Sequence, residues 1–389
     1  MFRKSIFLVL ALILTVSYFS ADEAATIPAF ARKYAFSCDT CHLITPKLKA
    51  YGEDFAGNAF QLPDEDEPVR AYRDVGDDNL LLQRDLPIGV RFDAYTRASS
   101  DGDISNDLET PFGVKLLSGG LIAKDIGYYF YFYMDERGEV AGLEDAYVHF
   151  NNIGGSQLDI MVGQFQISDP LFKRELRLTF EDYMIYKTKV GDCRANLTYD
   201  RGILATYTLP TNTDIIVELV NGNGIEDAGK DRVFDNDSLK NVFVKLSQPL
   251  SIATFGVFAY TGKEEGITAD NKFLFAGPDV SIGIDKLEIN AQYVMRTDDN
   301  PEFKAGKTDD IETSGIIGEI VINPHPEKSR LFGTILYNSV TSDMPGLEYE
   351  SITASVNYLY RTNLRLLAEF TQDIEYENSI FTLGFMAGF

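Results

Sequence analysis

The chain has 389 residues, a formal net charge of −24 and a pI near 4.5. A chain this acidic repels phosphates, so composition excludes nucleic acid as a partner. Its three cysteines and three histidines also limit the metal and redox sites that it can build.

The chain begins with a short basic stretch, Met1–Lys4, and continues with an apolar run from Ile6 to Phe19 and small residues near Ala21. This order is typical of a secretory signal peptide, which we place at residues 1–21. The run is shorter than the roughly 20 apolar residues of a membrane-spanning helix. It ends without a cysteine, which argues against a lipoprotein anchor. The sequence therefore predicts an exported protein.

Cys38, Cys41 and His42 form a C-x-x-C-H motif, the attachment sequence of a c-type haem. Two thiols at this spacing reach both vinyl groups of the porphyrin, and the histidine that follows ligates the iron. A zinc site needs four ligands, and no second Cys/His cluster supplies the other half. A redox dithiol would need a βαβ context, which the sequence lacks. The motif predicts one covalent haem c, bound by Cys38 and Cys41 with His42 as metal ligand.

Residues 22–62 surround this motif and form the predicted monohaem cytochrome c segment. Leu48, Tyr51 and Phe55 recur at helical spacing, which predicts a short helix after Pro46. A segment of about forty residues cannot bury a sizeable apolar core alone. We therefore expect the haem to serve as its core, wrapped by the helix and by aromatic side chains: Phe30, Tyr34 and Phe36.

Residues 63–86 are rich in acidic side chains, including the run Asp64–Glu67, which stands between Pro63 and Pro68. This composition predicts a solvated linker or periplasmic loop. A role in binding a cation or a partner is the alternative.

From residue 87 to residue 389 the chain alternates apolar and polar residues in segments of about ten, separated by turns. Clear examples are the segments at 287–296 and 351–361, the segment at 364–371 after a tight turn at Thr362–Asn363, and the last segment, which ends at Phe389. This pattern is typical of a transmembrane β-barrel with a lipid-facing apolar side and a polar lumen. We predict an all-β outer-membrane barrel of about sixteen strands in a Gram-negative bacterium.

A soluble β-sandwich also alternates, but three features favour the barrel. The pattern continues for about three hundred residues, more than one sandwich uses. The chain has 27 Phe and 21 Tyr, and many of them stand at strand ends, as interfacial girdles require. Tight connections such as Asp285–Lys286 alternate with long polar ones such as Asn221–Ser238 and Thr297–Thr313, as periplasmic turns and outer loops do.

The haem segment resembles the fused cytochrome–porins through Ile27–Arg32, which precedes the motif, and Pro46, which follows it. Four stretches of the early barrel are similar to that family and, more loosely, to phosphate-selective-type porins: Glu136–Gly138, Leu143–Tyr147, Gly163–Phe165 and Asp169–Leu178. One departure is Lys33–Tyr34, where the family's iron oxidases are expected to carry a glutamine.

The resemblance implies electron transfer across the outer membrane, with outer-membrane lipid around the barrel. Expected partners are an extracellular electron donor or acceptor, with Fe(II) as the best single donor, and a periplasmic c-type cytochrome. The resemblance does not supply the sixth iron ligand. His149, on a polar face with Asp145 and Tyr147, and Met134 are candidates, while His325 lies in a predicted turn.

Two functions stay open on the sequence alone. In the first, the protein is an electron carrier, and an Fe(II) oxidase if iron is the donor. In the second, it is a solute-conducting porin in which the haem segment is a structural or regulatory plug. Four arginines on polar faces would then select anions: Arg91, Arg97, Arg361 and Arg365. The direction of electron flow, the oligomeric state and the exact strand number are not readable from the residues.

Overall fold

The computed structural model describes residues 29–62, 72–73, 75–77, 79–80, 82–84, 87–100, 106–229, 231–306, 309–326 and 329–389. The signal peptide predicted at 1–21 and most of the acidic linker predicted at 63–86 lie outside these ranges. None of the described helices has the length and apolar character of a membrane-spanning helix.

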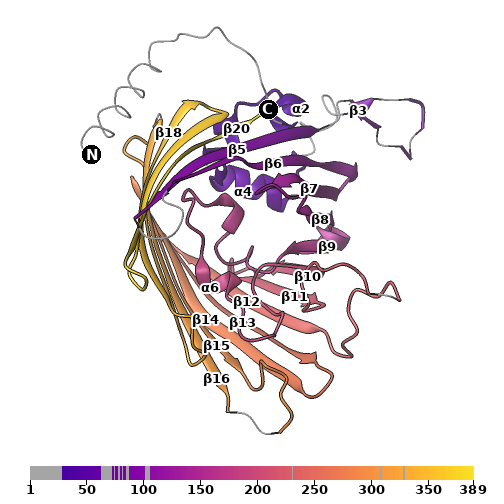
Figure 1. Ribbon diagram of the computed structural model, residues 1–389. Helices are drawn as coiled ribbons and strands as arrows, with labels where there is room; N and C mark the ends of the chain where they lie inside the picture. The colour runs from indigo at the N-terminus through magenta and orange to yellow at the C-terminus, as the bar shows by residue number, and fades with distance from the viewer. Residues whose placement is uncertain are drawn as a thin grey trace.

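Sixteen antiparallel strands, β5 to β20, close into one barrel (Figure 1). The ring closes where β20 pairs with β5, and two backbone hydrogen bonds join Val90 and Phe389, at 2.6 and 2.8 Å. The predicted all-β barrel of about sixteen strands is confirmed. The strands are β5 (Ile88–Ser99), β6 (Asn106–Ala123), β7 (Ile126–Glu136), β8 (Gly142–Phe150), β9 (Leu158–Gln166), β10 (Tyr199–Thr208), β11 (Asp214–Val220), β12 (Asn241–Leu250), β13 (Ala253–Glu265), β14 (Asp270–Ile284), β15 (Leu287–Asp298), β16 (Ile311–Ile322), β17 (Leu331–Ser342), β18 (Tyr349–Arg361), β19 (Leu364–Asp373) and β20 (Asn378–Gly388).

The outer surface of the barrel is apolar, as the alternation predicts. On β18, Ile352 and Val356 are exposed on the outside, whereas Ser351 and Thr353 are buried on the inside. The same alternation runs along β15, β19 and β20. An apolar outer face on a closed barrel suits lipid, because closure leaves no unpaired strand edge. The chain is an outer-membrane β-barrel.

Tight turns and long loops lie at opposite ends of the barrel. Turns such as Asp285–Lys286 and Thr362–Asn363 lie at one end, together with the chain terminus Phe389. The connection at residues 221–240 lies at the other end. Short turns are periplasmic and long loops are extracellular in such barrels. We call the first the tight-turn end and the second the outer end.

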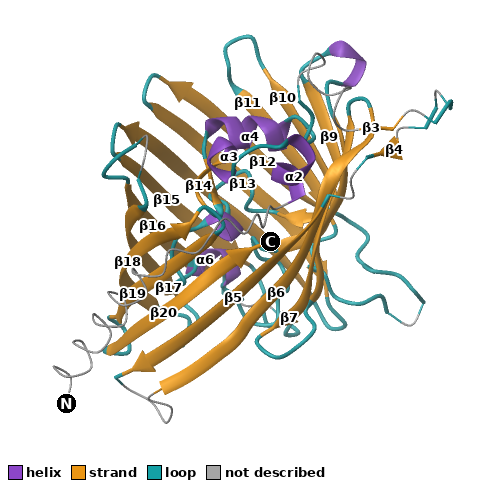
Figure 2. Ribbon diagram, turned by 90° about the horizontal axis from the view of Figure 1, so that it is seen from above, coloured by secondary structure: helices purple, strands orange, loops and turns teal. Residues whose placement is uncertain are grey.

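The interior of the barrel is occupied by two parts of the chain, as Figure 2 shows for their helices. The first is residues 29–62, here called the plug, with α2 (Ala29–Tyr34), α3 (Cys38–Cys41), β1 (His42–Ile44), β2 (Lys47–Leu48) and α4 (Ala50–Gly57). The second is residues 167–198 between β9 and β10, here called the inward loop, with the short 3₁₀ turn η2 (Arg174–Leu176) and α6 (Met184–Lys187). Outside the interior lie the two-residue strands β3 (Tyr72–Arg73) and β4 (Leu82–Gln83), and η1 (Ile153–Gly155) at a turn.

The inward loop explains why part of the inner face is apolar, although the sequence predicts a polar lumen. On β12 to β14 several inward side chains are aromatic, including Phe243, Tyr260 and Phe275, all fully buried. They form one core with Phe172, Tyr186 and other residues of the inward loop. The wall facing the loop meets protein instead of water, so apolar inward residues are stable there.

The plug docks closely on Gly127 of β7, and this contact can be tested. A Cβ atom at Gly127 would collide with the carbonyl oxygen of Ala59. We expect Gly127→Val to weaken docking by about 1–3 kcal/mol, a typical cost of overpacking. Proteolytic cleavage within the plug should become faster, and ion conductance through the barrel should rise.

Gly283→Val on β14 is the matched control, because a Cβ atom there meets no other atom within 4 Å. Equal cleavage rates for the two variants would contradict this docking geometry.

Candidate functional site

The C-x-x-C-H motif lies on one turn of helix inside the barrel. Cys38 and Cys41 are the first and last residues of α3, and His42 follows at once as the first residue of β1. Residues three apart lie on the same face of a helix, so both thiols face one side. Both thiols are free and partly buried. Burial raises the pKa of each thiol above its ordinary value.

The imidazole of His42 is held in one orientation by the plug itself. Its Nδ1 lies 3.0 Å from the carbonyl oxygen of Pro46 and donates to it. Burial lowers the pKa of His42, although the bond to Pro46 opposes this, so the ring is neutral near pH 7. A neutral imidazole with Nδ1 bonded to a carbonyl leaves Nε2 as the free lone pair, which is the state that a metal ligand requires. The residues present therefore fit a haem c.

The plug has an aromatic core of its own beside the motif. Tyr34, Phe55 and Phe60 are buried, and Phe30 stacks on Phe60 with ring centroids 5.0 Å apart. The helix predicted after Pro46 is present as α4, and it contributes Phe55 to this core. The hydroxyl of Tyr34 donates to the carbonyl of Phe60 at 3.2 Å.

Contacts on several sides fix the plug at the tight-turn end. Asn151 Nδ2 donates to Asn58 Oδ1 at 2.5 Å, and Thr45 Oγ1 donates to the carbonyl of Thr362 at 3.3 Å. Ile44 packs in a buried cluster with Val321 and Phe332. Lys173 of the inward loop pairs with Glu53 of α4. Because β16, β17 and the turns after β8 and β18 all take part, the wall positions the motif.

An ion pair joins Lys47 of the plug to Glu288 on β15. Lys47 Nζ lies 2.7 Å from Glu288 Oε1, with side chains 17% and 35% exposed. Burial alone would lower the pKa of Lys47, but the carboxylates of Glu288 and Glu319 outweigh it and raise the pKa. The lysine stays charged and ties the strand that follows the haem motif to the wall.

The two predicted candidates for a sixth iron ligand do not face His42. Met134 is 51% exposed and points outward from β7. His149 is buried on β8 and faces inward, as predicted, and pairs in register with Gly127, against which Ala59 packs. Ala59 follows α4 and His42 precedes it, and an eight-residue helix is about 12 Å long. His149 therefore lies beyond the far end of α4 from His42. His325 lies in a turn at the tight-turn end, as predicted.

A series of aromatic rings leads from the plug up the inner wall. Phe60 stacks on Tyr129 with centroids 5.3 Å apart. The series continues along β7 from Tyr129 to Tyr131 at 6.4 Å and from Tyr131 to Tyr133 at 5.8 Å. Lys115 Nζ lies 4.1 Å from the ring centroid of Tyr133. The sequence shows this aromatic run, but its link to the haem segment needs the fold.

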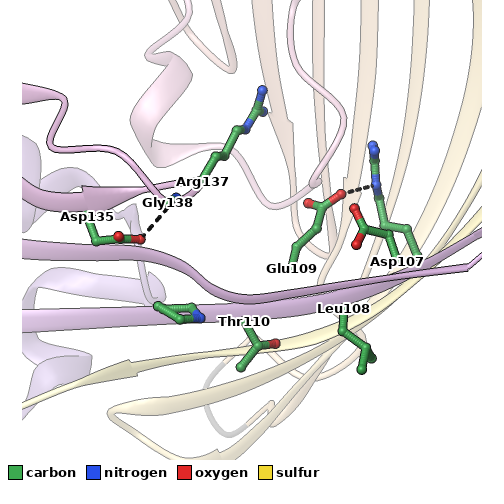
Figure 3. A pocket seen from close by; sticks show the side chains of 9 residues that line it. Asp107, Leu108, Glu109, Thr110, Asp135, Arg137 and Gly138 are labelled. Atoms are coloured by element: carbon green, nitrogen blue, oxygen red, sulfur yellow. Dashed lines mark hydrogen bonds and ion pairs between the residues drawn. The ribbon is translucent and has the colours of Figure 1, made fainter.

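The aromatic series ends next to a pocket at the outer end. The pocket has a volume of about 460 Å³ and is lined by residues of β5 to β7 and the loop that follows β7, with Asp135 only two residues beyond Tyr133. Arg97 Nε pairs at 2.6 Å with Glu109 Oε1. Glu109 is one of the pocket side chains labelled in Figure 3. Acidic and basic groups are mixed here, so the pocket has no simple anion preference.

The four arginines proposed to select anions differ in their surroundings. Arg91 pairs with Asp93 at 2.8 Å, and Arg97 pairs with Glu109. Arg361 is exposed, and its guanidinium lies over the ring of Tyr360. Arg365 is buried. Among the described residues, no three His, Cys, Asp or Glu side chains converge as ligands of a metal ion.

Comparison with known proteins supports the fold. No protein-family model and no curated protein sequence matches the chain. The outer membrane channel DcaP of Acinetobacter baumannii is similar in structure, with a TM-score of 0.58, 14% identity and coverage of 78% of this chain and 97% of that one. An anion-selective porin from Comamonas acidovorans has a TM-score of 0.56 at 9% identity, covering 78% and 98%. Salmonella typhi OmpF has a TM-score of 0.54 at 10% identity, covering 78% and 97%. The chain has the porin fold.

A charge swap tests how the plug is held. Lys47→Glu places a carboxylate beside Glu288, and we expect a loss of about 1–3 kcal/mol of docking free energy, between the values for exposed and buried pairs. Hydrogen exchange of the α4 amides should accelerate. Adding Glu288→Lys should restore much of the protection. If the single variant exchanges like the wild type, the ion pair does not hold the plug.

Proposed function

We propose that this outer-membrane barrel carries electrons through one haem c attached to Cys38 and Cys41 and ligated by His42. The single observation that carries the proposal is the hydrogen bond from His42 Nδ1 to the Pro46 carbonyl within a C-x-x-C-H motif enclosed by the barrel. Histidine ligands of metals typically donate their other ring N–H in this way. When bound, a haem c supplies an iron that cycles between two oxidation states.

The residues of the chain hold, orient and shield such a group. The wall contacts of the plug fix the motif at the tight-turn end, and the buried plug core limits the access of water. Burial and hydrogen bonding around a haem set its potential. Electron transfer requires no acid or base residue, only this placement and access for partners.

The placement requires partners on both sides of the membrane. The apolar band of such a barrel is about 25 Å tall, so one haem near the tight-turn end does not span it. A periplasmic c-type cytochrome is the partner on the near side. On the far side, an extracellular donor such as Fe(II), or an acceptor, exchanges electrons through the aromatic series from Tyr133 to Phe60.

Mixing the oxidised, detergent-purified protein with Fe(II) near neutral pH tests this function. We expect the reduced c-type absorbance band to appear promptly, because the motif predicts a redox-active iron. Reduction by dithionite but not by Fe(II) would reject iron as the donor and keep the haem. The lack of any c-type band would reject the proposal.

Substitution of Tyr131 tests the route. Tyr131→Leu removes the central ring between Tyr129 and Tyr133, and we expect haem reduction by an extracellular donor to slow at least tenfold. The rate with a donor supplied at the tight-turn end should not change. Tyr207→Leu on β10 is the matched control, because Tyr207 is exposed on the outer face. Equal rates in both variants would contradict the route.

A second candidate function is conduction of small solutes, with residues 29–62 as a structural or regulatory plug. The porin fold and the pocket at the outer end favour it. Single-channel recordings in planar bilayers distinguish the two functions. A plugged electron carrier should show small conductance that rises when residues 29–62 are deleted. Large conductance in the intact protein would favour the porin.

A further inference from the structure

Arg365 is a buried cation on the inner wall with unused hydrogen-bond donors. It lies on β19 with its side chain facing inward and only 3% exposed. Its guanidinium lies close enough to Tyr95 to interact with it electrostatically. Nε and Nη1, however, have no hydrogen-bond partner among the described residues. Buried donors in proteins are almost always paired, so two unpaired N–H groups on one guanidinium indicate a missing acceptor.

The carboxylate nearest in register to Arg365 already pairs with another arginine. Asp93 lies on β5, two strands from Arg365. Met386 of β20, the strand between them, pairs in register with Arg365 on one side and with Asp93 on the other. Both oxygens of Asp93 already accept from Arg91, Oδ1 from Nε at 3.0 Å and Oδ2 from Nη2 at 2.8 Å. Asp93 is thus neutralised by Arg91, and the positive charge of Arg365 is left for another anion.

Arg365 stands beside the haem-attachment motif. Its register partner on β18 is Leu359, which packs against the cluster that includes Leu43 and Ile44, the two residues after His42. Three residues before Arg365, the side chain of Thr362 lies beside the thiol of Cys38. The motif and the two residues that follow it therefore meet the wall at two positions, Leu359 and Thr362, both of which precede Arg365 closely in the sequence.

We propose that Arg365 binds a propionate of the haem, an inference that rests on the proposed function. A haem carries two carboxylates on the porphyrin edge opposite its thioether-linked vinyl groups. A planar guanidinium with adjacent free N–H groups matches one carboxylate in a bidentate manner. The bond satisfies the buried donors and fixes the rotation of the porphyrin against the wall. Arg365 is then a cofactor-binding residue supplied by the barrel.

The midpoint potential of the haem in the intact protein tests the assignment. Arg365→Gln removes a positive charge next to the haem, which favours the oxidised form. We expect the oxidation equilibrium to shift about tenfold, a fall of about 59 mV for a one-electron couple. The potential should also become pH-dependent near neutrality, because the freed propionate titrates there. Arg365→Lys should retain most of the wild-type potential.

Arg361→Gln is the matched control, since it removes an exposed arginine four residues away. Its potential should equal that of the wild type. If Arg365→Gln and Arg361→Gln give the same potential as the wild type, the assignment is overturned while the haem itself is retained. If purified wild-type protein carries no haem, the proposed function fails, and this is seen before any variant is made.

Thermal stability without haem supplies an independent readout. In a haem-free background, Cys38→Ala with Cys41→Ala, we expect Arg365→Gln to leave the melting temperature equal or higher, because a buried unpaired charge is removed. In the haem-bearing protein it should lower the melting temperature. The same sign in both backgrounds would overturn the proposal. So would stabilisation of the haem-free protein by inorganic phosphate through Arg365 with an unchanged haem potential, since Arg365 would then bind a free anion.

Discussion

Closure of the backbone hydrogen-bond ladder is the constraint on which the structure depends. In hydrocarbon an unpaired N–H or C=O group costs several kcal/mol, so a sheet can cross a membrane only as a closed ring. The pairing of β20 with β5 meets this requirement, and the last residue, Phe389, takes part in it. Closure creates an interior as well, and the inner surface must then meet water, protein or a cofactor.

In this chain protein fills much of that interior. The side chains that face inward therefore need not be polar. Around the inward loop, large aromatic side chains are stable on the inner face, because they pack against Phe172, Tyr183 and Tyr186. Polar inward residues serve there as anchors for the backbone of the loop. Arg296, for example, donates to the carbonyls of Thr188 and Ala195 while pairing with Asp298. The wall thus holds both internal segments with specific contacts.

The sequence predicts the barrel well because alternation records which face each strand residue occupies. The segments at 287–296 and 351–361 follow that rule, and most of their inward residues are polar in the structure. Val294 and Leu359 are apolar exceptions, because they pack against the inward loop and the plug. The inward loop is not predicted, because its packing lacks a repeating period. The sequence nevertheless contains a sign of this loop, because residues 167–198 separate two strands and show no alternation of apolar and polar residues. A connection of this length is usually functional.

The candidate site also has a part that the sequence predicts and a part that only the fold reveals. Local spacing predicts the haem motif, and Pro46 stands four residues after His42, close enough for its carbonyl to bond the imidazole. The contacts of Lys47 with Glu288, Phe60 with Tyr129 and Ile44 with Phe332 join positions far apart in the sequence. No local pattern encodes such pairings, because each depends on the register of the whole ring.

The small core of the plug makes the barrel responsible for the geometry of the site. Four buried residues, Tyr34, Phe55, Phe60 and Leu62, form its main cluster, which is too few for an independent domain. The rest of its stability comes from wall contacts on several sides. A cofactor in the plug would therefore be positioned by the same ring that separates the two sides of the membrane. Its alignment relative to the outer end and the periplasm is thus set by the barrel rather than by a flexible tether.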